Sequence, residues 1–241
     1  MYSDVDINEE IQARKTDAKL GIAIKPFNPN YLTPVGYDLS IGIKGFSWEK
    51  KSEIDIENEG KIEIEPNDTV VVETLESISL SKQVGATIHS MATRAVLQGL
   101  SHISTTIDPG WNGKLLISFH NYKDTSVELR FKDSFCTVCF YRVESESQVS
   151  LGRPPDRVDL WQNLIEVARQ ERKRQEKDLQ IRESKKKQEE RIRNILLVGF
   201  IIIAGSISHY ISANKPEYGA SFAAFLALFA PIIYKLLEKL L

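Results

Sequence analysis

The stretch Thr106-Ile-Asp-Pro-Gly-Trp-Asn-Gly-Lys-Leu-Leu-Ile-Ser-Phe-His-Asn121 contains two turn signals and then a run of apolar residues. Asp108-Pro-Gly110 and Asn112-Gly113 favour tight turns, because proline fixes φ and glycine adopts positive φ without steric cost. The run that follows, Leu115-Leu-Ile-Ser-Phe119, is typical of a strand. This stretch therefore predicts a tight turn that leads directly into a β-strand.

Short strand-like runs of this kind recur from Leu20 to Val143, and Asn28-Pro-Asn30 and Pro66-Asn-Asp68 supply further turns between them. The other runs are Gly21-Ile-Ala-Ile24, Tyr37-Asp-Leu-Ser-Ile41, Lys61-Ile-Glu-Ile64, Thr69-Val-Val-Val-Glu-Thr74, Ser126-Val-Glu-Leu129 and Phe135–Tyr141. Many short strands at regular spacing predict a mainly β domain, which is a sandwich, a jelly roll or a distorted barrel.

The charge of the chain differs between its two parts. Overall, 42% of the 241 residues are hydrophobic and 27% are charged, which is typical of a folded protein. Residues 1–156 carry 16 Lys/Arg against 23 Asp/Glu, whereas residues 157–241 carry 15 against 10. The two parts are therefore physically different regions. The acidic first part argues against a nucleic-acid partner, which would need a basic face.

The two cysteines, Cys136 and Cys139, are too few for a disulfide scaffold. They lie three positions apart in a predicted strand, so their side chains point to opposite faces and do not share one metal ion. No second pair completes a four-ligand zinc site. We therefore expect two reduced thiols and no metal site.

The N-terminal residues 1–10 have neither a basic segment nor an apolar run, so we expect no signal peptide and a cytoplasmic first domain. Residues 4–18 favour a short helix, with Ser3 as its N-cap and acidic residues in its first turn. Val5, Ile7 and Ile11 offer it a modest apolar face.

A linker over residues 149–158 is expected to precede a charged helix over residues 159–194, since Gly152-Arg-Pro-Pro155 ends any strand. Between Arg169 and Arg193 there are 11 Lys/Arg and 6 Asp/Glu. The large apolar residues there are Leu179, Ile181 and Ile192, too few for a regular coiled-coil seam. This pattern favours a solvated helix held by charge pairs, with a weak three-stranded coiled coil as the alternative.

Two uncharged runs follow, residues 195–213 and residues 218–234. Nineteen residues at about 1.5 Å each span about 28 Å, close to the hydrocarbon thickness of a bilayer. We expect two transmembrane helices, with a buried soluble hairpin as the alternative. Basic residues lie before the first run and after the second, with only Lys215 between them. The positive-inside rule then predicts a two-pass membrane protein with the N-terminal domain and the C-terminus both cytoplasmic.

Polar residues that suit a nucleotide gather in the interval from Ser90 to Gly113. Hydroxyls and a guanidinium suit phosphate oxygens, a carboxylate suits a ribose hydroxyl or a water, and an indole packs on a sugar or base. An ordinary polar turn between strands is the alternative. The candidate residues in this interval are Thr93, Arg94, Gln98, Thr106, Asp108 and Trp111.

Three segments resemble the dCTP deaminase branch of the trimeric dUTPase superfamily. Pro26–Gly42 is similar to its early element that ends in Asp-Leu-Arg-Leu-Gly, and Thr74-Leu-Glu-Ser-Ile-Ser-Leu-Ser81 is similar to its Thr-x-Glu segment. Gly99-Leu100 followed by Ile107–Gly113 resembles its nucleoside-binding hairpin. The resemblance covers roughly residues 1–143 and gives a first domain over residues 1–148. It implies a distorted jelly-roll β-barrel that forms a homotrimer, with nucleotide sites between subunits.

The functional residues of the family match only in part. The family's Arg-Ser-Ser-Leu-Ala-Arg phosphate element reads Met91–Gln98 here, so Thr93, Arg94 and Gln98 are its remaining candidates for phosphate contacts. Ser118 occupies the place of the glutamate that acts as general acid and base in the deaminases, and a serine hydroxyl does not replace a tuned carboxylate near neutral pH. Asp108 matches the superfamily aspartate that orients water and contacts the deoxyribose, and is the expected catalytic residue.

These features favour a membrane-anchored deoxynucleotide-binding protein, impaired in deamination, that acts as a nucleotide sensor or effector. An active dCTP deaminase or dUTP/dCTP pyrophosphatase is the alternative, and a scaffold without a ligand is a third. The expected partners are a deoxynucleoside triphosphate or a related nucleotide, two further copies of the chain in a homotrimer, and membrane lipid. We expect no required cofactor, and Mg²⁺ only in company with a bound triphosphate.

Overall fold

The computed structural model describes residues 1–102, 104–149 and 152–215, and beyond them residues 221, 224, 228 and 235. The chain divides into two compact units, Met1–Arg172 and Lys173–Leu241. The first unit therefore contains the predicted β domain and also the beginning of the long C-terminal helix. The second unit contains the remainder of that helix.

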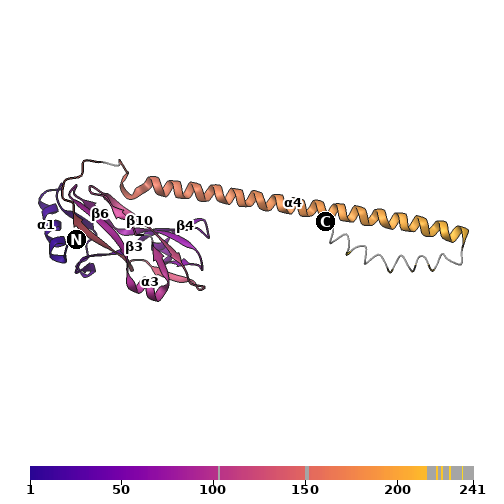
Figure 1. Ribbon diagram of the computed structural model, residues 1–241, viewed down its shortest axis with the longest axis horizontal. Coiled ribbons are helices and arrows are strands. Elements are labelled where there is room, and N and C mark those ends of the chain that lie inside the picture. Colours follow the sequence, from indigo (N-terminus) through magenta and orange to yellow (C-terminus); the bar gives the residue numbers. More distant parts are fainter. Residues whose placement is uncertain are drawn as a thin grey trace. The chain divides into compact units, whose positions relative to one another are not determined.

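Strands dominate the first unit (Figure 1). They are β1 (Ile22–Lys25), β2 (Leu32–Thr33), β3 (Gly36–Ser47), β4 (Ser52–Asp55), β5 (Lys61–Ile64), β6 (Thr69–Leu80), β7 (Val84–Ser90), β8 (Leu100–His102), β9 (Thr106–Ile107), β10 (Asn112–Asn121), β11 (Val127–Arg130) and β12 (Ser134–Arg142). Within the described residues, ten of them form one curled antiparallel sheet in the order β8-β10-β6-β3-β12-β7-β9, with β1 on β6 and with β2 and β4 on β3. Strands β5 and β11 form a separate pair. The expected mainly β domain is confirmed.

Along each strand, successive side chains point to opposite faces of the sheet. In β10 the side chains of Leu115, Ile117 and Phe119 are buried in the main core, whereas Leu116 and Ser118 lie on the opposite face and are half-buried. This follows from the two-residue period of a strand. The sequence pattern of β10 thus determines that Ser118 is not a core residue.

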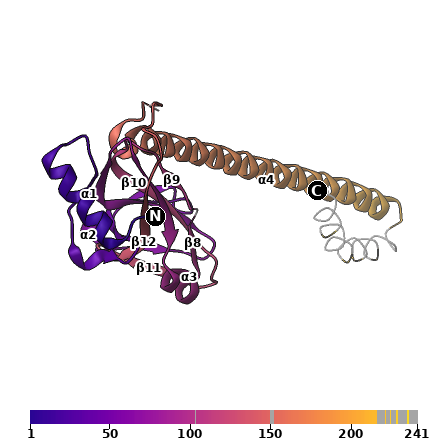
Figure 2. The ribbon, with the colours of Figure 1, turned by 60° about the vertical axis from the view of Figure 1, so that its left-hand side comes forward.

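The N-terminal helix is confirmed as α1 (Asp4–Thr16), two residues shorter than expected. Ser3 and Asp6 form a reciprocal capping box at its start, and Ile7 and Ile11 are buried against the sheet. Two shorter helices complete the β domain, α2 (Ile56–Glu59) and α3 (Ala92–Gln98), and α3 leads directly into β8 (Figure 2).

Helix α4 (Val158–Asn214) follows a short 3-10 turn, Pro155–Arg157. Its first turns belong to the first unit, where Trp161 and Ala168 are buried with Phe46 in a second apolar cluster. Leu116 and Val71, from β10 and β6, pack against this cluster. The beginning of α4 therefore covers the face of the sheet that lies opposite the main core.

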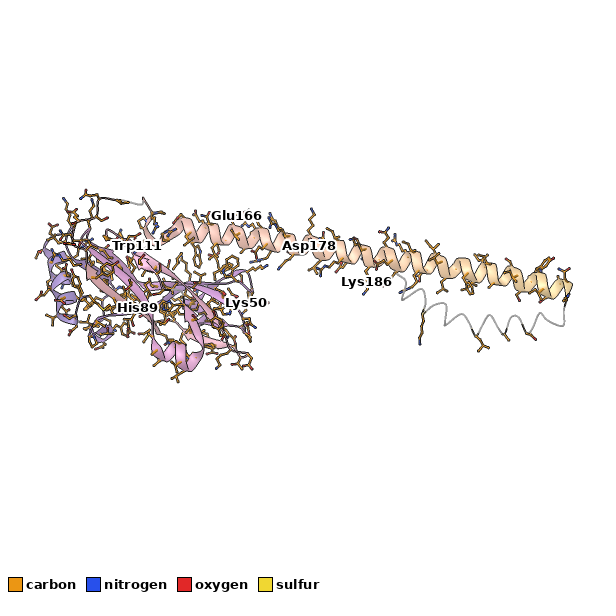
Figure 3. All side chains as sticks on the ribbon, viewed as in Figure 1. Lys50, His89, Trp111, Glu166, Asp178 and Lys186 are labelled. Atoms are coloured by element: carbon orange, nitrogen blue, oxygen red, sulfur yellow. The ribbon has the colours of Figure 1, made fainter. Side chains whose placement is uncertain are left out.

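In the second unit, α4 continues without a break through the expected charged helix and the first uncharged run. Asp178 and Lys186 are exposed, and their side chains point away from the helix (Figure 3). Within the described residues, α4 is the one helix that is long and apolar enough to cross a membrane, by length and composition. Ile195 and Ile203 in its apolar part are 70% and 61% exposed. The second expected span, residues 218–234, lies outside the described residues apart from three helical positions, 221, 224 and 228.

Candidate functional site

A cavity of about 420 Å³ lies beside the turn that joins β9 to β10. Asp108 and Trp111, two of the residues expected from the sequence, line it. Trp111 is labelled in Figure 3. Its remaining described lining comes from the turn after β6 and from the segment before α4. The lining residues are Lys82, Asp108, Pro109, Gly110, Trp111, Asn112, Ser147, Val149, Gly152, Arg153, Pro154 and Pro155.

Main-chain hydrogen bonds fix the turn that carries Asp108. The Trp111 N–H donates to the carbonyl of Asp108 at 3.1 Å, and the Gly110 N–H donates to the carbonyl of Ser81 at 3.1 Å. Gly110 has φ of +81°, which a glycine adopts without strain. The indole Nε1 of Trp111 donates to the carbonyl of Gly113 at 3.0 Å, so the ring is held at the side of the cavity.

Described residues after β12, namely Ser147, Val149 and Gly152 to Pro155, line the other side of the cavity. The Ser147 N–H donates to the carbonyl of Lys82 at 3.0 Å, which ties this segment to the turn after β6. Further along, Arg153 Nη1 lies 3.1 Å from Asp108 Oδ2. Both side chains are partly exposed, at 43% and 44%, so a dissolved ligand can reach the pair.

The charged residues of the described lining are Lys82, Asp108 and Arg153, which leave one net positive charge. A concave site with excess positive charge attracts an anionic ligand, and a single carboxylate beside an indole suits the hydroxyls and ring of a sugar. The arrangement therefore fits a small organic anion that carries hydrogen-bonding hydroxyls.

The residues expected to bind phosphate lie elsewhere. Thr93, Arg94 and Gln98 are on α3, and none of them lines this cavity. The Arg94 guanidinium donates to the carbonyl of Ser134 at 2.7 Å and to Gln98 Oε1 at 3.0 Å, and it lies 3.3 Å from Asp133 Oδ2. In the single chain, Arg94 therefore joins α3 to the start of β12.

Thr106 and Ser118 are also outside the lining of the cavity. Thr106 is exposed on β9, where it pairs with Thr87 of β7. Ser118 lies opposite Val71 of β6, on the face of the sheet that the start of α4 covers farther along at Leu116. One chain thus brings together Asp108 and Trp111 but leaves the other five expected residues apart from them.

Sequence reasoning missed two residues of the cavity, Lys82 and Arg153. Both lie outside the polar interval from Ser90 to Gly113. The only local signal at Arg153 is Gly152-Arg-Pro-Pro155, a pattern that predicts a linker. Nothing in such a segment indicates that its arginine reaches a carboxylate 45 positions earlier in the chain.

The structure offers few ligands to a metal ion. Among the described residues, no three His, Cys, Asp or Glu side chains converge to hold one. Asp108 is the one carboxylate in the described lining of the cavity, so a cation there would need further oxygens from a bound ligand.

The comparison with known proteins identifies the family of the first part of the chain. The family model described as dCTP deaminase-like matches residues 3–143, and this chain belongs to that family. The dCTP deaminase of Pyrococcus abyssi is 35% identical over 129 residues, which are 53% of this chain and 80% of the relative. The dCTP deaminase of Pyrococcus furiosus is 36% identical over 129 residues, with the same coverage.

Solved structures are similar at lower identity. The 2'-deoxycytidine 5'-triphosphate deaminase from Agrobacterium tumefaciens is 16% identical with a TM-score of 0.46, over 58% of this chain and 47% of that one. A dUTPase mutant from phage phi11 of S. aureus, whose structure shows a coordinated structural Mg(II) ion, is 13% identical with a TM-score of 0.40, over 54% of this chain and 96% of that one. The part of this chain beyond residue 143 lies outside the family match.

Proposed function

We propose that this chain is a membrane-anchored deoxynucleotide-binding protein, impaired in dCTP deamination, that acts as a nucleotide sensor or effector. The cavity at Asp108 and Trp111 carries the proposal. Its volume of about 420 Å³ lies in the usual range for small-molecule sites, and Lys82 and Arg153 give its lining a positive excess. A deoxynucleoside triphosphate combines the required negative charge with a sugar hydroxyl for Asp108 and a base or sugar for Trp111.

Impaired deamination is proposed from Ser118. Its hydroxyl stands where the family resemblance implies a carboxylate that moves protons during the reaction. Loss of general acid and base catalysis typically lowers a rate by ~10²–10⁴. Binding does not depend on proton transfer, so a chain with this substitution is able to bind its nucleotide and to turn it over slowly.

The proposed assembly is a homotrimer, in which each subunit has the distorted jelly-roll fold. Asp108 and Trp111 lie apart from Thr93, Arg94 and Gln98 in one chain, and a second copy is able to supply the missing half of the site. Val96 and Leu97 support this proposal, since these two α3 side chains are 79% and 74% exposed in the single chain. Apolar side chains that protrude beside a candidate binding residue are typical of an interface.

Membrane anchoring by two spans is proposed from the C-terminal part of the sequence. The apolar part of α4, residues 195–213, has no charged residue, and its large aliphatic side chains are largely exposed. In the proposal, residues 218–234 cross the membrane in the opposite direction, so that the N-terminal domain and the C-terminus are both cytoplasmic. Exposure of such side chains to water is unfavourable, whereas their exposure to lipid is not.

The second candidate function is an active dCTP deaminase, or a dUTP/dCTP pyrophosphatase, with an anchor. The observation in its favour is that the relatives at 35% and 36% identity are themselves dCTP deaminases. Asp108 is retained, and hydrolysis of the phosphoanhydride bond of the triphosphate needs an oriented water rather than the carboxylate that Ser118 replaces. Mg²⁺ would then neutralise the bound triphosphate.

The test uses the full chain in detergent, with each deoxynucleoside triphosphate, with and without Mg²⁺. Binding is measured by calorimetry, and products are separated by chromatography. The proposal predicts binding of at least one nucleotide with little conversion of dCTP to dUTP. Rapid deamination would establish the second candidate. Asp108→Ala should weaken binding, whereas Asp124→Ala, which removes an exposed carboxylate away from the cavity lining, should not.

A further inference from the structure

We propose that residues 152–157 form a strap that competes with the bound nucleotide for Asp108 and thereby couples the site to the start of α4. This inference rests on the proposed function, because it describes the regulation of the same site. The strap is attached to the β domain at two points, through Arg153 and through Asp156. It leads directly into α4, which begins at Val158.

The first attachment is the ion pair between Arg153 and Asp108, in which Nη1 and Oδ2 are 3.1 Å apart. In this pair, Arg153 occupies the Asp108 carboxylate, which the site would otherwise offer to a sugar hydroxyl. Both side chains are more than two-fifths exposed, and exposed ion pairs are weak. A ligand with several contacts in the cavity is therefore able to displace Arg153.

The second attachment is tighter. The main-chain N–H of Lys114, at the start of β10, donates to Asp156 Oδ1 at 2.6 Å. Gly113 makes this approach possible, since a Cβ at that position would lie 2.3 Å from the nitrogen of Asp156. Gly113 also has φ of +130°, which disfavours other residues. The strap thus contacts the start of β10 directly, next to the turn that carries Asp108.

The backbone of the strap is held in a conformation that it would not retain alone. Asp156 and Arg157 have φ of +57° and +48°, and two consecutive left-handed residues other than glycine are unfavourable. The contact with Lys114 and an ion pair of 3.0 Å between Arg157 and Asp159 maintain them. Release of the strap therefore removes backbone strain.

Arg153 and Asp156 are joined by Pro154-Pro155, whose φ angles are fixed by their rings. A stiff connection transmits a displacement of Arg153 to Asp156 rather than absorbing it. When a nucleotide binds to Asp108, Arg153 leaves that carboxylate for the phosphates of the ligand, Asp156 loosens from Lys114, and the first turn of α4 gains freedom. Occupancy of the site and the seating of α4 are therefore opposed, and each weakens the other.

Hydrogen exchange of the full chain in nanodiscs, read at single amides, tests this coupling with dCTP and dUTP as probes. The Lys114 amide reports directly on Asp156, its acceptor. We expect a saturating nucleotide to raise exchange at Lys114 by about two- to five-fold, the range that corresponds to an exposed ion pair. Arg153→Ala should show the raised exchange without ligand and no further rise with it. Arg142→Ala is the matched control, because its guanidinium contacts Gln83 instead.

Each outcome decides the inference. If a nucleotide binds but exchange at Lys114 stays the same or falls, the strap does not compete with it and only the inference fails. The same holds if Arg153→Ala exchanges like the unmodified chain in the absence of ligand. If no nucleotide binds at all, the proposed function fails and the inference with it.

Discussion

The indole Nε1 of Trp161 donates to Glu53 Oε1 at 2.7 Å, and this contact joins the first turns of α4 to strand β4. The Trp161 ring itself is buried, and the Lys44 ammonium lies 4.6 Å from the centre of the ring. The cation is held in place by Glu73, at 3.1 Å. The beginning of α4 is therefore part of the folded β domain.

Replacement of Trp161 should consequently destabilise the β domain. Trp161→Ala removes a buried aromatic side chain, and we expect it to lower the free energy of unfolding by about 3–5 kcal/mol. Trp161→Phe keeps most of the apolar contact and loses the hydrogen bond to an exposed carboxylate, which should cost about 1 kcal/mol. Denaturant unfolding followed by near-ultraviolet circular dichroism measures both. Leu160→Ala, at a neighbouring position that is 44% exposed, is the control and should change little. An effect of Trp161→Ala as small as this control would show that the helix is not seated on the sheet.

The sequence predicted those features of the fold that depend on neighbours in the chain. Alternation within β10, the turn at Asp108 and the Ser3 cap are local patterns, and the structure has all three. The contacts of the segment before α4 were not predicted. Trp161 meets Glu53 across 108 positions, and Asp156 meets Lys114 across 42. No local pattern indicates which distant strand such a residue reaches.

The candidate site was predicted in part for the same reason. Asp108 and Trp111 were found because one turn carries both. The charge of Arg94 makes it a phosphate candidate in the sequence, but the structure directs that charge to Asp133 and to the carbonyl of Ser134, at the start of β12. Residue type indicates what a side chain is able to bind, whereas the fold decides what it does bind within its own chain.

Glu76 gives a prediction for the dependence of stability on pH. This residue of β6 is 1% exposed, and burial raises the pKa of its carboxyl group, although the Ser40 N–H donates to it at 2.8 Å. In the unfolded chain the carboxyl group has its ordinary pKa. The folded state therefore holds the proton more tightly, and Glu76 lowers stability as pH rises from the ordinary value through the raised one.

Glu76→Gln removes this titration and keeps an oxygen that accepts from Ser40. We expect the variant to gain stability relative to the unmodified chain as pH rises above about 4.5, and the gain to level off once the folded carboxyl group is ionised. Unfolding free energies measured from pH 4 to pH 8 test this. Glu144→Gln, at an exposed position, should show no such trend. A difference that shrinks with rising pH would contradict the assigned direction.

The two thiols of β12 should be poorly reactive in the folded protein. Cys136 is fully buried, and burial, followed by the nearby charges of Glu76 and Asp38, raises its pKa well above the ordinary value. Burial likewise raises the pKa of Cys139. Because the thiolate is the reacting form, we expect alkylation by iodoacetamide at pH 8 to be slower by ~10² or more than in denaturant. Mass spectrometry counts the modified residues, and Cys139→Ser isolates the reaction of Cys136. Rapid modification of Cys136 in the folded chain would contradict its placement in the core.

The proposed two-pass topology predicts where each part of the tail lies. Residues 169–193 carry 11 Lys/Arg against 6 Asp/Glu, and Lys235 and Lys239 follow the second run, so the positive-inside rule retains both ends in the cytoplasm. Reporters fused after Arg172 and after Leu241 should both be cytoplasmic. In a chain with both cysteines replaced by serine, Lys215→Cys should react with an impermeant maleimide added from outside, because residue 215 lies in the short connection between the runs. Lys235→Cys is the matched control and should react only after the membrane is opened. An external reporter after Leu241, together with external labelling at Lys235→Cys, would establish a single span and overturn the hairpin.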